Sequence, residues 1–135
     1  MDPSVHVGER SRERSSIDER AARAAAGFAA AGVRAGDAVA LLLRNDFPFL
    51  EAGAGAALLG AYAVPLNWHF ARAEIDYVLQ DCDAKVLVVH ADLLRLVDPL
   101  LLRPERLKVI VVPTEPGLRK AYRSPSVGPS AGRAI

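Results

Sequence analysis

Three continuous aliphatic runs constrain the fold of this chain more than any other feature. They are AVALLL at 38–43, KVLVV at 85–89 and KVIVV at 108–112. None of them alternates apolar with polar residues, so each predicts a strand that is covered on both faces of its sheet. The connections between the runs are long enough to hold helices, which is typical of parallel crossovers. The sequence therefore predicts an α/β fold with a mostly parallel sheet flanked by helices.

The first helix is predicted from residue 16 to 31, because apolar residues recur there at three- to four-residue spacing. The members of this stripe are Ile17, Ala21, Ala24, Phe28 and Ala31. Ser16 and Glu19 have the spacing of a capping box at its start. Gly32 is suited to the left-handed residue that follows a helix, so we expect the helix to end there.

Two more helices and one short strand are predicted in the connections. Asn45 or Asp46 can cap a helix that runs to Gly60, with Pro48 in its first turn. Small residues at 52–56 would let this helix lie close against the sheet. A strand at 62–66 follows, and a third helix should run from Glu74 to about residue 83. A helical linker with two prolines is expected between the last two aliphatic runs.

The chain divides into three parts by composition. Residues 1–15 are polar and aperiodic, which predicts a flexible arm, and residues 16–122 hold the α/β elements. Residues 123–135 are rich in Ser, Pro, Gly, Ala and Arg, which predicts a disordered tail. We therefore expect one partial α/β subdomain between two unstructured ends.

Charge and cysteine content exclude several classes of partner. The net charge is +1 and basic residues alternate with acidic ones, so no basic stripe for nucleic acid or an acidic membrane is predicted. No apolar run reaches the roughly 20 residues that span a bilayer, and no secretory signal is recognisable. The single cysteine, Cys82, excludes an internal disulfide. The expected location is the cytoplasm.

Three sequence blocks, in order and at the expected spacing, resemble the N-terminal part of the AMP-forming acid–CoA ligases (acyl-CoA synthetases). The first is Arg20-Ala21-Ala22-Arg23 through Gly32-Val33, followed by Gly36-Asp37 and an apolar strand. The second consists of Asn45, Phe49, Leu50, Gly60, Ala61, Val64, Pro65, Leu66 and Asn67. The third runs from Glu74 to Val89. The resemblance covers about residues 17–112 and implies that the chain is an N-terminal fragment of such a ligase.

The resemblance implies a two-step reaction. A carboxylate attacks the α-phosphate of ATP, giving an acyl-adenylate and pyrophosphate, and coenzyme A then displaces AMP, with Mg²⁺ stabilising the phosphates. The sequence NWHF at 67–70 favours a fatty-acid or other carboxylic-acid CoA ligase over a peptide-synthetase module, and a fatty acid is the expected substrate. The family's phosphate-binding loop, ending in Pro-Lys-Gly, and its catalytic lysine match no position of this chain. We therefore assign no catalytic, cofactor-binding or metal residue, and expect the chain alone to be inactive and to bind no cofactor.

Two other hypotheses remain open on the sequence. The chain could be a free-standing interaction module that pairs with the remainder of a ligase or inhibits a separate ligase chain. This hypothesis is motivated by the sheet edges and helix faces that an early end to the domain leaves uncovered. An unrelated flavodoxin-like binding domain is the third possibility.

Two glycine patterns superficially resemble nucleotide-binding motifs. Gly128-Pro-Ser-Ala-Gly132-Arg133 has one residue too few between its glycines for a phosphate-binding loop and ends in Arg, so we interpret it as tail. Gly53-Ala-Gly55 lies inside a predicted helix and lacks the third glycine of a dinucleotide fingerprint. Close packing of the helix on the sheet is the preferred interpretation.

The segment from Pro65 to Phe70 ends a predicted strand, where ligands gather in α/β sheets. A rigid turn is the preferred interpretation of Pro65-Leu66-Asn67. Trp68, His69 and Phe70 are expected to line a surface that docks against the rest of a longer ligase, rather than to contact substrate.

Neither the histidines nor the cysteine predict a chemical site. His6, His69 and His90 are far apart in sequence and have no second ligand at metal-binding spacing. Cys82 lies between Asp81 and Asp83, whose negative charge should raise the pKa of the thiol rather than activate it.

Overall fold

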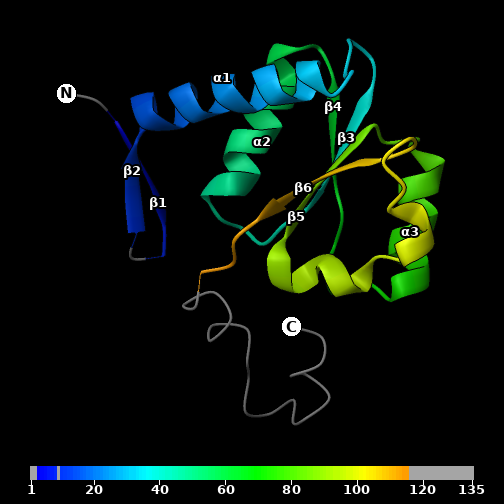
Figure 1. The fold of residues 1–135 in the computed structure, drawn as a ribbon. Helices are drawn as coiled ribbons and strands as arrows, with labels where there is room; N and C mark the ends of the chain where they lie inside the picture. The colour runs from blue at the N-terminus through cyan, green and yellow to red at the C-terminus, as the bar shows by residue number, and fades with distance from the viewer. Residues whose placement is uncertain (1–2, 9, 116–135) are drawn as a thin grey trace, which may run out of the picture.

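Four parallel strands form the central sheet, in the order β4–β3–β5–β6 (Figure 1). In the computed structural model, which describes residues 3–8 and 10–115, the strands are β3 (Ala38–Leu42), β4 (Tyr62–Pro65), β5 (Val86–His90) and β6 (Lys108–Val112). Val39 of β3 lies opposite both Ala63 of β4 and Val86 of β5. The predicted mostly parallel sheet flanked by helices is confirmed. The expected tail at 123–135 lies outside the described residues.

Burial differs between the central and the edge strands. Every residue of β3 and β5 is buried, as their unbroken aliphatic sequences predicted. β6 is an edge strand, with exposed residues at Lys108, Ile110 and Val111. The expectation that the 108–112 run is covered on both faces is therefore wrong in this structure.

Helices cover the two faces of the sheet (Figure 1). α1 (Arg14–Ala30) and α2 (Phe47–Leu58) pack on one face through Phe28, Ala52 and Ala56. α3 (Arg72–Asp81) packs on the other face through Ile75 and Leu79. The same face carries the 3-10 helices η1 (Ala91–Leu96) and η2 (Pro99–Leu101), which form the predicted helical linker. In the described part of the chain, no helix is long and apolar enough to cross a membrane.

The N-terminal segment is a hairpin rather than an arm without regular structure. β1 (Ser4–Val7) pairs antiparallel with β2 (Arg10–Glu13), and β2 leads directly into α1. α1 consequently begins at Arg14, with Glu13 in the N-cap position, so the predicted capping box of Ser16 and Glu19 is wrong. The expectation of an irregular segment at 1–15 fails because Arg10 and Arg12 are paired with acidic residues of the domain.

The predicted helix ends are largely confirmed. Gly32 and Gly60 follow α1 and α2 with φ of +96° and +72°, the left-handed conformation that glycine adopts without strain. Asp46 occupies the N-cap position of α2, but its carboxylate makes no capping hydrogen bond. The Asp46 carboxylate pairs with Arg10 instead, so this residue, predicted as a helix cap, holds the hairpin against the domain.

α1 and α2 approach each other closely at Gly55. A Cβ atom built on Gly55 would lie 2.9 Å from the carbonyl oxygen of Ala21 and 2.9 Å from Cβ of Ala24. The close packing predicted for the Gly53-Ala-Gly55 segment is thus real at Gly55. It joins helix to helix, however, and not helix to sheet.

We predict opposite effects for two alanine substitutions in α2. Gly55→Ala should lower the free energy of unfolding by about 1–3 kcal/mol, because the two helices must separate. Gly53→Ala is the matched control, since a Cβ there would meet nothing within 4 Å. It should raise stability by about 0.5–1 kcal/mol through the higher helix propensity of alanine. Urea unfolding followed by circular dichroism measures both, and equal effects would contradict the assigned contact.

Candidate functional site at the carboxyl edge of the sheet

The carboxyl ends of β3 and β5 form the switch point of the sheet. The chain leaves β3 through α2 towards β4 on one face, and leaves β5 through η1 towards β6 on the other. In open α/β sheets, ligands bind in the crevice between two strands whose connections diverge in this way. The residues that follow β3 and β5 are therefore the first to consider for function.

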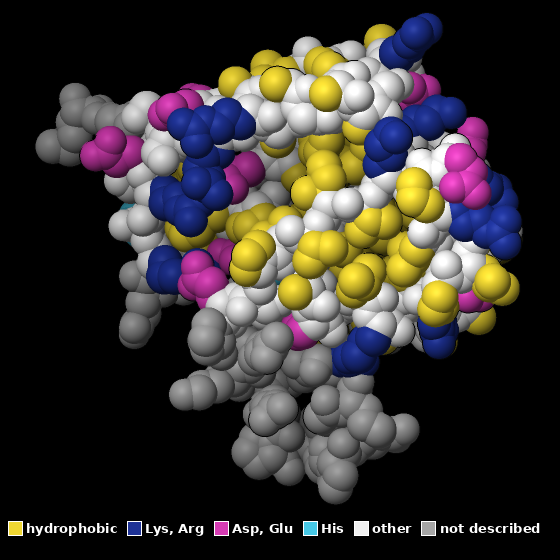
Figure 2. Space-filling view, viewed as in Figure 1, with side chains coloured by type: hydrophobic (Ala, Val, Ile, Leu, Met, Phe, Trp, Pro, Cys, Tyr) yellow, Lys and Arg dark blue, Asp and Glu magenta, His cyan; other side chains and the backbone are white. Residues whose placement is uncertain are grey.

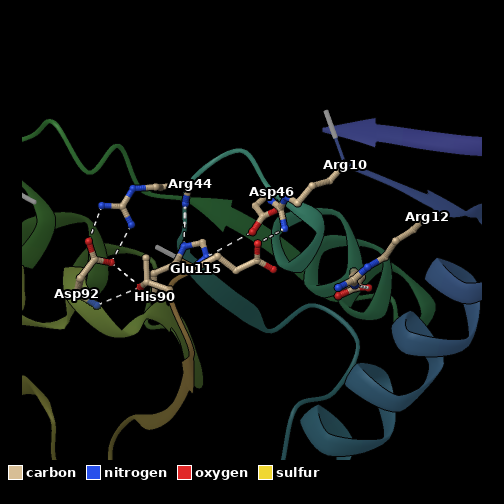
Figure 3. A network of polar contacts seen from close by, with 9 residues as sticks. Arg10, Arg12, Arg44, Asp46, His90, Asp92 and Glu115 are labelled. Carbon is tan, nitrogen blue, oxygen red and sulfur yellow. Dashed lines mark hydrogen bonds and ion pairs between the residues drawn. The ribbon is translucent and has the colours of Figure 1, made fainter. Parts of the chain in front are cut away.

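Arg44 and Asp92 fill this crevice with a buried, bidentate ion pair (Figure 3). Arg44 Nη1 donates to Asp92 Oδ1 over 2.7 Å, and Nη2 donates to Oδ2 over 2.5 Å. The Arg44 side chain is fully buried and that of Asp92 is 6% exposed. Thr114, which follows β6, donates its hydroxyl to Asp92 Oδ1 over 2.6 Å. One carboxylate thus links the ends of β3, β5 and β6.

His90, the last residue of β5, is fully buried beside this pair. Its Nδ1 accepts a hydrogen bond from the backbone N–H of Arg44 over 3.1 Å, so the neutral ring carries its proton on Nε2. Nε2 has no hydrogen-bond partner among the described residues and lies 3.9 Å from Asp46 Oδ2. Burial lowers the pKa of His90, and the positive charge of Arg44 lowers it further, while Asp46 and Asp92 oppose the shift. His90 is therefore held in its neutral form.

Two arginines of β2 extend the polar network along α2. Arg10 pairs with the buried Asp46 and, through Nη1, with Glu115 Oε2 over 2.7 Å. Arg12 Nη1 lies 3.0 Å from Glu51 Oε2. Both guanidinium groups lie over the ring of Phe47, at 5.2 and 4.6 Å from its centroid, within cation–π range. The hairpin is thus fastened to the start of α2 by charge and by ring contact.

An open groove lies on the sheet face beside this network. It has a volume of about 380 Å³ and an apolar floor that includes Phe28, Val88 and Ile110. Arg20 and Glu51, also in its lining, are paired with Nε 2.7 Å from Oε2. Figure 2 shows the corresponding spread of hydrophobic side chains below α1 and over β6. α1 and α2 line the groove on one side, Val88 at its floor is buried, and Ile110 of the edge strand is 38% exposed.

The segment after β4 forms the predicted turn. Asn67 Oδ1 accepts a hydrogen bond from the His69 backbone N–H over 2.9 Å, and Leu66 is buried. Trp68 is half-buried against the core, with its ring 5.2 Å from the Arg44 guanidinium, so it supports the ion pair. Only His69 and Phe70 of the expected docking surface are exposed, and docking by them stays a prediction.

The three histidines considered as metal ligands lie on separate elements of the structure. His6 lies on β1, His69 follows β4 and His90 ends β5. Within residues 3–8 and 10–115, no group of three His, Cys, Asp or Glu side chains is placed to hold a metal ion. Burial raises the pKa of the Cys82 thiol, and Asp81 and Asp83 raise it further, so the direction agrees with the sequence prediction although burial is the larger cause.

The polar network itself was not predicted from the sequence. Arg44, Asp46, Asp92 and Thr114 are among the first polar residues after three buried or half-buried strands. Applying the rule that polar groups meet at the carboxyl edge of a parallel sheet would have found them. Their charges are paired with one another, so the crevice is filled by the protein's own side chains. The arrangement can fix the strand ends in place.

Comparison with known proteins identifies the family. Residues 7–132 match the model of the AMP-binding enzyme family. The chain belongs to this family. It is 39% identical over 71 residues to a long-chain-fatty-acid–CoA ligase of Mycobacterium tuberculosis, covering 53% of this chain and 14% of that protein. It is 36% identical over 97 residues to a long-chain-fatty-acid–CoA ligase of Thermus thermophilus, covering 71% and 18%.

The solved structures give the same result for the fold. An anthranilate CoA ligase in complex with anthranoyl-AMP superposes with a TM-score of 0.72 and 28% identity, covering 78% of this chain and 20% of that one. The aligned part of this AMP-binding family chain corresponds to less than a fifth of the length of each of the two fatty-acid ligases named above. It has the fold of the N-terminal domains of such ligases, as the three sequence blocks predicted.

Titration of His90 should make the stability of the chain depend on pH. Because the pKa of His90 is lowered in the folded state, the unfolded state binds more protons as the pH falls through about 6.5. Stability should therefore fall on acidification from neutral pH, by at most about 1.4 kcal/mol per pH unit from this group. His90→Asn, whose Oδ1 can still accept the Arg44 N–H, should flatten this dependence. His69→Asn, at an exposed position, should not, and equal pH profiles for the two variants would contradict the assignment.

Breaking the ion pair should destabilise the fold strongly. Asp92→Asn leaves the buried Arg44 guanidinium without its counter-ion, and we expect a loss of about 3–5 kcal/mol in the free energy of unfolding. The control is Asp18→Asn, which breaks an exposed pair with Arg14 and should cost at most about 0.5 kcal/mol. Combining Arg44→Met with Asp92→Leu should recover part of the loss, since neither charge then remains buried. Chemical denaturation measures all three; similar losses for Asp92→Asn and Asp18→Asn would contradict the buried role.

Proposed function

We propose that this chain is the N-terminal segment of an ATP-dependent, AMP-forming carboxylic acid–CoA ligase whose acid is a fatty acid. The observation that carries the proposal is the agreement between the family match over residues 7–132 and the superposition on an anthranilate CoA ligase. The assignment of a fatty acid as the substrate is supported by the sequence NWHF at 67–70 and by the two related proteins, both of which are long-chain-fatty-acid–CoA ligases. Cytoplasmic location remains the expectation drawn from the sequence.

The role we assign to this segment is that of scaffold. The family reaction requires donors that stabilise charge on the α-phosphate and on pyrophosphate, together with Mg²⁺. No stretch of the sequence matches the loop or the lysine that supplies them in the family. The arginines at the carboxyl edge are paired with Asp46, Asp92 and Glu115. We therefore propose that the chain has no ligase activity alone and that ATP, Mg²⁺ and coenzyme A are bound by the longer enzyme.

The scaffold role is testable by a chimera. Residues 16–112 would replace the matching segment of the Thermus thermophilus ligase, and fatty-acid-dependent release of pyrophosphate from ATP would be measured. We expect the chimera to be active, and the purified 135-residue chain to release none with a panel of fatty and aromatic acids. The control chimera carries Gly55→Leu, which should prevent α1 from packing on α2 and abolish activity.

Two results would contradict this proposal. Release of pyrophosphate by the purified chain would show that it carries an ATP site of its own. A chimera that unfolds cooperatively on heating but has no activity would show that this segment cannot replace the matching segment of the ligase.

The open groove favours a second candidate function. We propose as the alternative that the chain acts as an interaction module, which complements the remainder of a ligase or inhibits an intact one. The motivation is the 380 Å³ groove, whose lining includes the exposed Ile110 of the edge strand β6. Titrating the chain into the intact Thermus thermophilus ligase should then lower its rate, and Ile110→Asp should weaken the effect. An unchanged rate at saturating chain, together with failure to restore activity to a ligase lacking its N-terminal segment, would refute the alternative.

A further inference from the structure

His90 has an unused hydrogen-bond donor beside a carboxylate (Figure 3). Its side chain is fully buried, and Nε2 has no hydrogen-bond partner among residues 3–8 and 10–115. Asp46 Oδ2 lies 3.9 Å from Nε2, which is too far for a hydrogen bond. A buried donor without an acceptor lowers the stability of the fold. The two groups are therefore close enough to bond after a small movement, but they are held apart.

Asp46 is held by the N-terminal hairpin. Its Oδ1 pairs with Arg10 of β2, while Oδ2 is the oxygen near His90. Arg10 also pairs with Glu115, and its guanidinium lies over the ring of Phe47. One buried carboxylate thus lies between two basic groups. The guanidinium on the hairpin is always charged, whereas the imidazole at the end of β5 titrates close to neutral pH.

Protonation of His90 would change two sets of contacts at once. Nδ1 accepts the backbone N–H of Arg44, and a proton on Nδ1 would convert this acceptor into a donor and break the bond. The charged ring would be repelled by the Arg44 guanidinium and attracted by Asp46 and Asp92. Asp92 already accepts hydrogen bonds from Arg44 and from the Thr114 hydroxyl. Asp46 is therefore the carboxylate that an imidazolium can recruit.

We propose that Asp46 exchanges partners with pH, holding Arg10 and the hairpin when His90 is neutral, and binding His90 and releasing the hairpin when His90 takes up a proton from solvent. In the acid form, Asp46 accepts the Nε2 proton of His90. Repulsion between the imidazolium and the Arg10 guanidinium then weakens the attachment of β2. The hairpin keeps the pair between Arg12 and Glu51, but the Arg12 side chain is 31% exposed, and such pairs hold weakly.

The switch should operate as the pH falls below about 6.5, where an unperturbed histidine titrates. Burial lowers the pKa of His90 while the hairpin is docked. The docked form therefore binds fewer protons than the released form, and acidification favours release. By linkage, docking of the hairpin lowers the proton affinity of His90 by the same factor by which protonation weakens docking.

Amide ¹⁵N relaxation of the purified 135-residue chain tests the release. The chain carries His6→Gln, because His6 lies in β1 and would titrate within the hairpin itself. From pH 7.5 to 5.0 the order parameters of Val5 and Val7 should fall from about 0.85 to below about 0.6, while those of β3 and β5 stay high. Adding His90→Asn, whose Oδ1 can still accept the Arg44 N–H, should keep the hairpin ordered. A hairpin that stays ordered at pH 5.0, that loosens equally with His90→Asn, or that loosens only together with β3 and β5 would overturn the proposal.

The reciprocal effect is measured on His90 itself, by following its ring protons in an NMR titration. Arg10→Gln frees Asp46 and should raise the pKa of His90, with an increase in proton affinity of about fivefold or more. Arg23→Gln, which removes an exposed pair with Glu19, is the control and should leave the titration unchanged. In an Asp46→Asn background Arg10→Gln should have no effect, because the exchange requires the carboxylate. An unchanged titration in Arg10→Gln, or the same rise with and without Asp46, would overturn the proposal.

Discussion

The buried ion pair between Arg44 and Asp92 is the contact on which the arrangement of the carboxyl edge depends. The loops after β3 and β5 diverge to opposite faces of the sheet, and their first polar side chains meet between them. Such pairs are costly to bury and are strong only when both hydrogen bonds are well formed and the remaining polar atoms are satisfied. Here the Thr114 hydroxyl gives Asp92 a further donor, so the carboxylate also fixes the end of β6.

The hairpin is also held by ion pairs between arginines and buried carboxylates, here near the surface of the molecule. Arg10 and Arg12 approach the buried carboxylates of Asp46 and Glu51, and both lie over the ring of Phe47. These contacts order a segment that has almost no apolar residues of its own. The hairpin therefore belongs to the fold because of its charges, and the acidic side chains at the start of α2 are buried because the hairpin supplies their partners.

The fold could be predicted from local patterns, because unbroken aliphatic runs and glycine helix ends act within a few residues. The β6 sequence 108–112 was misjudged for a physical reason. Its pattern resembles that of β5, and only the position at the edge decides whether its faces are covered. The anchoring of the hairpin and the Arg44–Asp92 pair were missed because Arg10–Asp46 and Arg44–Asp92 each join residues more than 30 positions apart. The absence of assigned catalytic residues stays a prediction, which the paired charges of the crevice support.

The central claim is that the carboxyl edge of the sheet is closed by the protein's own side chains and serves as structure. The most direct test is an NMR titration of the purified chain with MgATP, following the backbone amides of Arg44, His90 and Asp92. The account predicts that these resonances keep their positions up to high nucleotide concentration. A saturable displacement confined to these residues would contradict it, because it would show that the crevice opens to bind nucleotide.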